Sequence, residues 1–126
     1  MTVKIDINSE IAVYKQIVDA LRPMLVEGLF APGDTLPSIR QLAADLGVHF
    51  NTVAEAYRIL ASEGWLELRR KRGAVVLSRE TPKPDSAAAK NFAKRLKEMV
   101  AEVQSSGLRS ITIVEELRKV AEKLEA

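Results

Sequence analysis

Two short helical patterns separated by a single glycine, within residues 36–64, restrict the fold of this chain more than any other feature. Ser38 is a candidate N-cap of the first helix, with Gln41 three residues later as in a capping box, and Gly47 ends that helix. The apolar faces of the two helices consist of Ile39, Leu42, Ala43 and Leu46, and of Val53, Ala56, Tyr57 and Leu60. Two helices joined by one tight turn predict a helix-turn-helix, whose second helix usually enters the major groove of DNA.

The segments on either side of this pair extend the motif. Residues 12–27 have the pattern of an opening helix, and residues 65–68 and 74–77 have the pattern of two short strands. The turn between the strands ends at Gly73, which suits a hairpin turn that needs a positive φ. The order of helix, helix-turn-helix and hairpin predicts a winged helix-turn-helix, a mainly α fold whose small β-hairpin forms the wing.

The composition changes at residues 81–86, where two prolines among polar residues predict a short, stiff linker. We therefore expect a winged helix-turn-helix domain over residues 1–80 and a two-helix region over residues 87–126. The first tail helix is predicted to end before Gly107. Thr112 is a candidate N-cap for the second, with a glutamate three residues later as in a capping box.

Apolar residues at helical spacing give each of these two tail helices one apolar face. Two helices of this size cannot bury such faces completely on each other, so they need a partner surface, and the simplest partner is a second copy of the chain. We therefore expect a homodimer. The residues predicted to mediate dimerisation are Phe92, Leu96, Met99, Val100, Val103, Val114, Leu117, Val120 and Leu124.

The overall composition is that of a globular protein, with 47% hydrophobic and 29% charged residues. No apolar run approaches the roughly 18 residues of a membrane span, and no apolar leader is evident, so we expect a cytoplasmic protein without membrane contact. Cysteine is absent, which excludes disulfides, thiolate metal ligands and a cysteine nucleophile. With one histidine, no glycine-rich phosphate loop and no carboxylates at a metal-binding spacing, we expect no enzyme, no metal and no cofactor.

Charge is concentrated in the turn of the expected wing. Before residue 81, ten basic residues are matched by ten acidic ones, and four of the ten basic residues are consecutive, from Arg69 to Arg72. Such a concentrated positive site suits contact with phosphates, and Arg72 can reach into a narrow minor groove. The alternative is a solvated, charged hairpin tip.

Seven short motifs occur in a fixed order across residues 11–77. They are Val13-Tyr-Lys-Gln-Ile17, Pro32-Gly-Asp-Thr-Leu-Pro-Ser-Ile-Arg40, Leu42-Ala43, Leu46-Gly-Val48, Asn51-Thr-Val53, Ala56-Tyr57 and Glu63-Gly64. In this order and spacing they resemble the N-terminal DNA-binding domain of the GntR family of bacterial transcription regulators. About 40 residues follow the linker, which is similar to the YtrA-like subfamily and implies that the short tail serves dimerisation.

The resemblance implies DNA contacts from both helices of the pair and from the wing. The family's arginine at the position of Arg40 grips phosphate or the edge of guanine, and the alternative here is an ion pair with Asp45 or another acidic residue. Asn51 can pair with adenine and Thr52 can donate to phosphate, the alternative being local capping. Tyr57 is expected in the core, with its hydroxyl free for a phosphate. The residues expected to contact DNA are Ser38, Arg40, His49, Phe50, Asn51, Thr52, Tyr57, Arg58, Arg70, Lys71, Arg72 and Gly73.

Three residues near the start of the second helix depart from the family pattern. His49 stands where the family usually has a good N-cap such as serine or asparagine, and imidazole is a poorer cap, which leaves this ring to contact phosphate or a base. Phe50 stands where many members have arginine or proline, and it lies either against thymine methyl groups or in a local core contact. Ala54 stands where some members place an arginine that contacts bases.

These expectations together indicate a homodimeric, sequence-specific transcription regulator that binds double-stranded DNA. A repressor at a palindromic operator is its simplest form, because two copies related by a two-fold axis read two half-sites. The alternative is a winged-helix module that binds another protein without specific DNA recognition. Salt dependence distinguishes the two, since binding dominated by phosphate contacts weakens steeply as salt rises. The sequence identifies no effector, and a ligand held at the dimer interface is one hypothesis for regulation.

Overall fold

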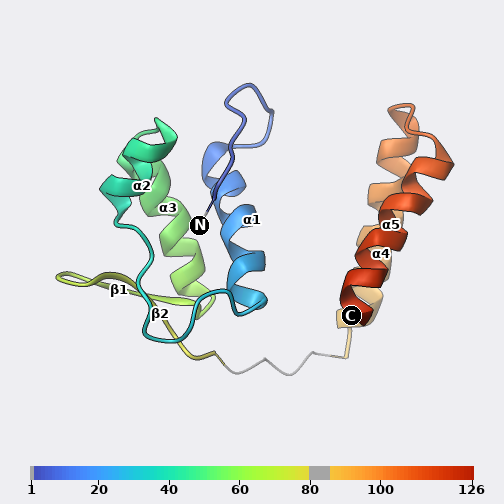
Figure 1. Ribbon diagram of the computed structural model, residues 1–126. Coiled ribbons are helices and arrows are strands. Elements are labelled where there is room, and N and C mark those ends of the chain that lie inside the picture. Colours follow the sequence, from blue (N-terminus) through green and yellow to red (C-terminus); the bar gives the residue numbers. More distant parts are fainter. Residues whose placement is uncertain (1, 80–85) are drawn as a thin grey trace. The chain divides into compact units, whose positions relative to one another are not determined.

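The computed structural model describes residues 2–79 and 86–126, and the chain forms two compact units, Met1–Thr81 and Pro82–Ala126 (Figure 1). The predicted linker, residues 81–86, lies outside the described residues except for Ser86. The first unit contains α1 (Val13–Val26), α2 (Ile39–Leu46), α3 (Phe50–Ser62), β1 (Leu66–Arg69) and β2 (Gly73–Val76). The second unit contains α4 (Ala88–Ser105) and α5 (Ser110–Glu125).

The core of the first unit lies where α3 packs against both α1 and α2 (Figure 1). Its largest fully buried side chains are Tyr57, Ile17, Leu21, Leu60, Leu66 and Val53. Gly47 ends α2 in the left-handed conformation, with φ of 69°, and α3 begins three residues later. The predicted mainly helical winged helix-turn-helix is therefore confirmed, because the expected apolar faces of the helix pair form this core.

The wing is an antiparallel pair in which the strands begin and end one residue away from the predicted positions. Leu66 pairs with Val76, and Arg69 pairs with Gly73 at the turn end. Gly73 has φ of 71°, which confirms the predicted left-handed conformation. Trp65, predicted to begin the first strand, lies outside it because its N–H donates to the carbonyl of the helix residue Leu60 (3.0 Å).

A short segment before α2 connects the start of that helix to the wing. Thr35 pairs with Val75 in an antiparallel bridge beyond the hairpin itself. The N–H of Leu36 donates to the carbonyl of Ala74 (2.9 Å), and Leu36 is buried. Because this segment is tied to β2 immediately before α2 begins, the first turn of α2 lies next to the hairpin.

The second unit is a pair of helices, and α5 begins earlier than predicted. The N-cap of α5 is Arg109, which makes no side-chain capping bond, so the predicted capping box at Thr112 is wrong. The N–H groups of Thr112 and Ile113 instead donate to the carbonyl of Arg109 (3.0 and 3.2 Å), which extends the helix backward by one turn. Ile113, the residue after Thr112, is buried. None of the helices in the described part of the chain is long and apolar enough to cross a membrane.

Candidate nucleic-acid interface

The start of α2 holds an arginine whose charge is not offset by a neighbour. The hydroxyl of Ser38 accepts a hydrogen bond from the N–H of Gln41 (3.1 Å), which confirms the predicted N-cap. The side chain of Gln41 does not complete a capping box, because it donates instead to Asp45 Oδ1 (3.1 Å). Arg40 is exposed and has no ion-pair partner among the described residues, so the alternative pairing with Asp45 is wrong.

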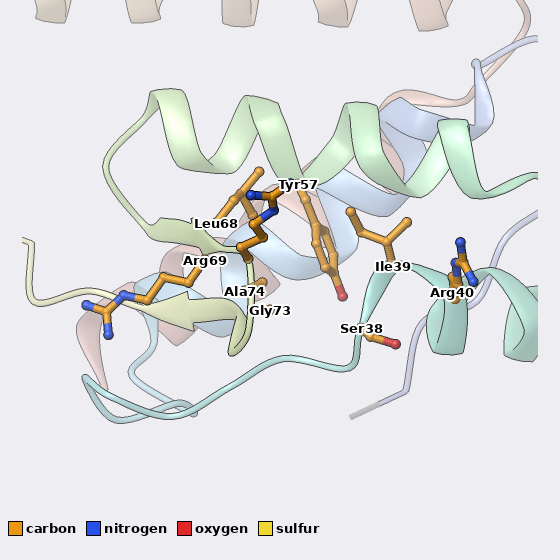
Figure 2. Close-up of a pocket in the computed structure, with 9 residues that line it drawn as sticks. Ser38, Ile39, Arg40, Tyr57, Leu68, Arg69, Gly73 and Ala74 are labelled. Carbon is orange, nitrogen blue, oxygen red and sulfur yellow. The ribbon is translucent and has the colours of Figure 1, made fainter.

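A pocket of about 260 Å³ joins this helix start to α3 and to the wing (Figure 2). Figure 2 shows Arg40 and Arg69 on opposite sides of the pocket, with Tyr57 between them. The lining residues are Ser38, Ile39 and Arg40 from the α2 side, Tyr57 from α3, and Leu68, Arg69, Arg70, Gly73 and Ala74 from the hairpin. The guanidinium groups of Arg40, Arg69 and Arg70 surround an apolar floor. They suit contact with a nucleic-acid phosphate backbone that passes between α2 and the wing.

Tyr57 supports this pocket from within the core. Its side chain is fully buried, and its hydroxyl donates to the backbone carbonyl of Pro37 (2.7 Å). Burial raises the pKa of Tyr57 well above its usual value. The expected core position is confirmed, but the expectation of a hydroxyl free for phosphate is wrong, because that hydroxyl holds the segment leading into α2.

The start of α3 is capped by a histidine. His49 Nδ1 accepts a hydrogen bond from the N–H of Asn51 (3.1 Å), so this imidazole is a working N-cap despite the weaker preference for histidine there. Because Nδ1 is the acceptor, the ring proton of the neutral imidazole is on Nε2. The ring stacks on Phe50, with centroids 4.5 Å apart and planes inclined by 27°. Phe50 is 51% exposed and is absent from the described core packing, so the alternative of a local core contact is wrong.

The remaining candidate residues of α3 differ in whether their side chains form hydrogen bonds or ion pairs within the described residues. The side chains of Asn51 and Thr52 make no hydrogen bond within residues 2–79 and 86–126, so the alternative of local capping by these groups is not realised. Asn51 is exposed and Thr52 is half-buried. Arg58 is exposed but pairs with Glu55 one turn away (3.0 Å), which offsets its charge on the same helix.

The basic run of the wing divides into one paired and three unpaired residues. Arg69 pairs with Glu67 (3.0 Å), and this bond raises the pKa of Arg69 and lowers the pKa of Glu67. Arg70, Lys71 and Arg72 lie exposed at the turn and pair with no acidic group in the part of the chain that the structure describes. The unpaired positive charge of the wing is therefore carried by its turn.

A second group of charged residues, at the far end of α3, is structural. Glu63 accepts two bonds from Arg22, at 2.9 and 2.5 Å, and these join the end of α3 to α1. Arg79 donates to the backbone carbonyl of Glu63 (2.9 Å), and its guanidinium lies 4.3 Å from the ring centroid of Trp65. Sequence reasoning noted Glu63 only as part of a motif, since nothing in local spacing shows a partner 41 residues away.

Sequence reasoning also missed the apolar floor of the pocket. Leu68 lies in β1 beside charged residues, and it is 41% exposed although its neighbour Leu66 is buried. Leu68 is two residues from Leu66 and so lies on the same face of the strand, and an apolar residue on that face beside a basic run was the available signal. No group of three or more histidine or acidic side chains among the described residues is placed to hold a metal ion.

Comparisons with known proteins identify relatives for this arrangement. The family model of the bacterial regulatory proteins, gntR family, matches residues 13–76. The transcriptional repressor YtrA of Bacillus subtilis (strain 168) is 27% identical over 119 residues, which cover 94% of this chain and 92% of that protein. The structure of YtrA from Sulfolobus acidocaldarius, a GntR-family transcription factor, is 34% identical with a TM-score of 0.56 and covers 98% of this chain and 100% of that chain. A transcriptional antiterminator from Listeria monocytogenes EGD-e shares the fold, with a TM-score of 0.72 at 24% identity, over 100% of this chain and 91% of that chain.

Proposed function

The chain belongs to the GntR family of bacterial regulatory proteins, and we propose that it represses transcription by binding double-stranded operator DNA as a homodimer. The observation that carries this proposal is the surface around the pocket, where the start of α2, the helix α3 and the wing come together (Figure 2). Four basic residues on this surface, Arg40 and Arg70 to Arg72, have no acidic partner among the described residues. Unpaired positive charge on neighbouring elements is what attraction to a phosphate backbone requires.

Each part of this surface has its own role in the proposed complex. Arg40 binds a phosphate or the O6/N7 edge of guanine, and Ser38 beside it caps the helix that carries it. Asn51 pairs with the edge of an adenine, and Thr52 donates to a phosphate. The turn from residue 70 to residue 72 binds phosphates across the wing, with Gly73 setting its backbone.

The second unit supplies the proposed dimer interface. Ile113 is the one buried residue of α4 and α5 in the described part of the chain. Of the nine residues predicted for dimerisation, five line an apolar pocket of about 160 Å³ between the two helices: Leu96, Met99, Val100, Val103 and Leu117. Only Leu96, Val100 and Val103 are half-buried. The other six remain exposed: Phe92, Met99, Val114, Leu117, Val120 and Leu124. A second copy of the chain that covers this face would bury the exposed apolar residues of α4 and α5 in both copies. The two-fold axis of such a dimer would place one α3 at each half-site of a palindromic operator.

Repression is supported by a relative. The similar YtrA of Bacillus subtilis is named a transcriptional repressor, and a dimer seated on a promoter blocks access of polymerase. We place the protein in the cytoplasm, where its DNA partner lies. No catalytic role is part of the proposal, since the relatives reported above are regulators of transcription rather than enzymes.

The test is selection of binding sites from random DNA by the purified full chain, followed by titration of the selected site at several salt concentrations. We expect a palindromic consensus and a steep loss of affinity with salt. The Arg40→Ala and Arg72→Ala variants each lower the slope of log affinity against log salt by about 0.9 if each residue neutralises one phosphate. Lys15→Ala is the matched control, because Lys15 is paired with Asp19 on α1 (2.8 Å).

Two outcomes would contradict the proposed function. Failure of the selection to enrich any sequence would remove the claim of specific DNA recognition. Binding that does not change with salt would favour a winged helix that contacts another protein through an apolar surface.

A further inference from the structure

The start of α3 carries an exposed aromatic ring whose presence the basic surface does not explain. Phe50 is the first residue of α3, and half of its side chain is exposed. Its ring contact within the described residues is the stack on His49. An exposed phenylalanine beside polar and basic residues contributes nothing to phosphate binding, so an apolar partner outside the chain would explain it.

His49 makes two interactions that help to position this ring. Its Nδ1 accepts from the N–H of Asn51, which anchors the imidazole to the first turn of α3. Its ring stacks on Phe50 with centroids 4.5 Å apart, and this contact favours one orientation of the exposed phenyl ring. Holding the ring before binding lowers the entropy that a contact with a partner would otherwise cost.

Ala54 is half-buried and places only a methyl group one turn along α3 from this ring. Residues four apart lie on the same side of a helix, so Ala54 is the neighbour of Phe50 one turn along α3. A larger side chain at position 54 would stand beside the ring, where this chain has only a methyl group. His49, Phe50 and Ala54 thus lie together at the start of α3.

The major groove offers one apolar group to such a ring. Among the base edges exposed there, thymine alone carries a methyl group, at C5, and contacts of alanine or phenylalanine with it are a known form of base reading. We propose that Phe50, held in place by His49 and flanked by Ala54, reads the methyl group of one thymine in each half-site. Phe50 and Ala54 contact the base in this proposal, and His49 is a positioning residue. The inference rests on the proposed function, because it requires α3 in the major groove.

The experiment uses the operator selected by the wild-type chain, with each thymine replaced in turn by deoxyuridine, which lacks only the methyl group. One position in each half-site is expected to show about fourfold weaker binding when its methyl is removed, the effect of one buried methyl-sized group. With Phe50→Ala, the same replacement is expected to have no effect. Phe50→Leu retains an apolar side chain, and we expect it to keep part of the sensitivity.

The controls separate the roles of the two rings. Leu29→Ala removes an exposed apolar side chain in the turn after α1 and is expected to leave the deoxyuridine pattern unchanged. His49→Asn keeps a capping acceptor but removes the stacked ring, so we expect α3 to stay folded by circular dichroism while sensitivity to the methyl group falls.

Several outcomes would overturn the inference. It fails if no thymine of the selected operator is sensitive to loss of its methyl group, or if Phe50→Ala remains as sensitive as the wild type. Full sensitivity in His49→Asn would remove the positioning role of His49. Failure to select any operator would overturn the proposed function as well, so the two failures are distinguishable.

Discussion

Tyr57 connects the core of the first unit to its surface through a single hydroxyl. The ring is fully buried between the helices, while the hydroxyl donates to the carbonyl of Pro37 and so holds the segment that leads into α2. Ser38 and Arg40 follow directly on that segment. Tyr57 has no proposed contact with DNA, but it thus holds the backbone segment that carries two residues of the proposed DNA surface.

Replacing Tyr57 with phenylalanine removes only this hydroxyl. Because the carbonyl of Pro37 loses its donor, we expect the free energy of unfolding in urea to fall by about 1 kcal/mol. Tyr14→Phe is the matched control, since Tyr14 is exposed and its hydroxyl makes no bond within the described residues; we expect a change below about 0.5 kcal/mol. Operator affinity of the folded variant should stay within about twofold, and a tenfold loss would show that DNA binding depends on this hydroxyl.

The elements of this fold were predictable where a periodic apolar face and an end signal agreed. Ser38 and Gly47 mark the ends of α2, and both act as the sequence predicted. Thr112 has the same local pattern as a capping residue but lies inside α5, because the carbonyl of Arg109 already accepts from the first turn. The same capping pattern therefore marked a helix start at Ser38 but not at Thr112, which lies inside a helix that begins earlier.

The side-chain partners at the candidate site were less predictable than the elements. Asp45 was the alternative partner considered for Arg40, yet its carboxylate accepts from Gln41, which is at the favourable spacing of four residues. The hydroxyl of Tyr57 finds a carbonyl 20 residues away, and no periodicity reports such a contact. The sequence therefore predicted some of the residues that line the pocket, such as Arg40 and Arg70, but not its apolar floor and not which polar groups are already bonded.

The pair of Arg22 and Glu63 joins two elements and makes their packing sensitive to pH. The hydrogen bond and the charge of Arg22 lower the pKa of Glu63 below its usual value in the folded chain. Between its folded and its unfolded pKa, such a carboxylate binds fewer protons in the folded chain than in the unfolded chain. The stabilisation of the fold by the Glu63 carboxylate is therefore fully present above the pKa of the unfolded chain. It is lost as the pH falls through the pKa of the folded chain.

Replacing Glu63 with glutamine tests this dependence. Because both side chains of the pair are partly exposed, we expect the variant to be less stable at pH 7 by only about 0.5 kcal/mol. The difference should shrink toward zero as the carboxylate of the wild type is protonated in acid, measured by urea unfolding at pH 7 and pH 3. Glu10→Gln serves as control, since Glu10 is exposed and forms no ion pair with any described residue. A difference that persists unchanged in acid would show that packing, not charge, links α1 to α3.

At the scale of the whole molecule, the two units have different requirements for stability. The first unit has its own core, built from three helices and the hairpin. The second unit has one buried residue among those described and an exposed apolar face on both helices. A dimer through α4 and α5 would therefore serve two purposes, because it completes the second unit and supplies the symmetry for two half-sites.

Leu117→Arg tests both purposes at once. Leu117 lies on the apolar face of α5 and lines the pocket between the two tail helices, so a guanidinium there would have to be desolvated in a dimer. We expect sedimentation to show a dimer for the wild type and a monomer for the variant. Since a monomer reaches one half-site at a time, its affinity for the palindrome should fall by at least about a hundredfold, toward that of a single half-site.

The matched control places the same charge elsewhere on the same helix. Glu115→Arg introduces an arginine two residues away at an exposed polar position, where no desolvation is required. It should remain dimeric and bind the palindrome at least as well as the wild type, because it adds positive charge. If Leu117→Arg also stays dimeric with wild-type affinity, another surface of the chain must form the interface. If it becomes monomeric yet keeps full affinity, the palindrome is not read by two joined copies.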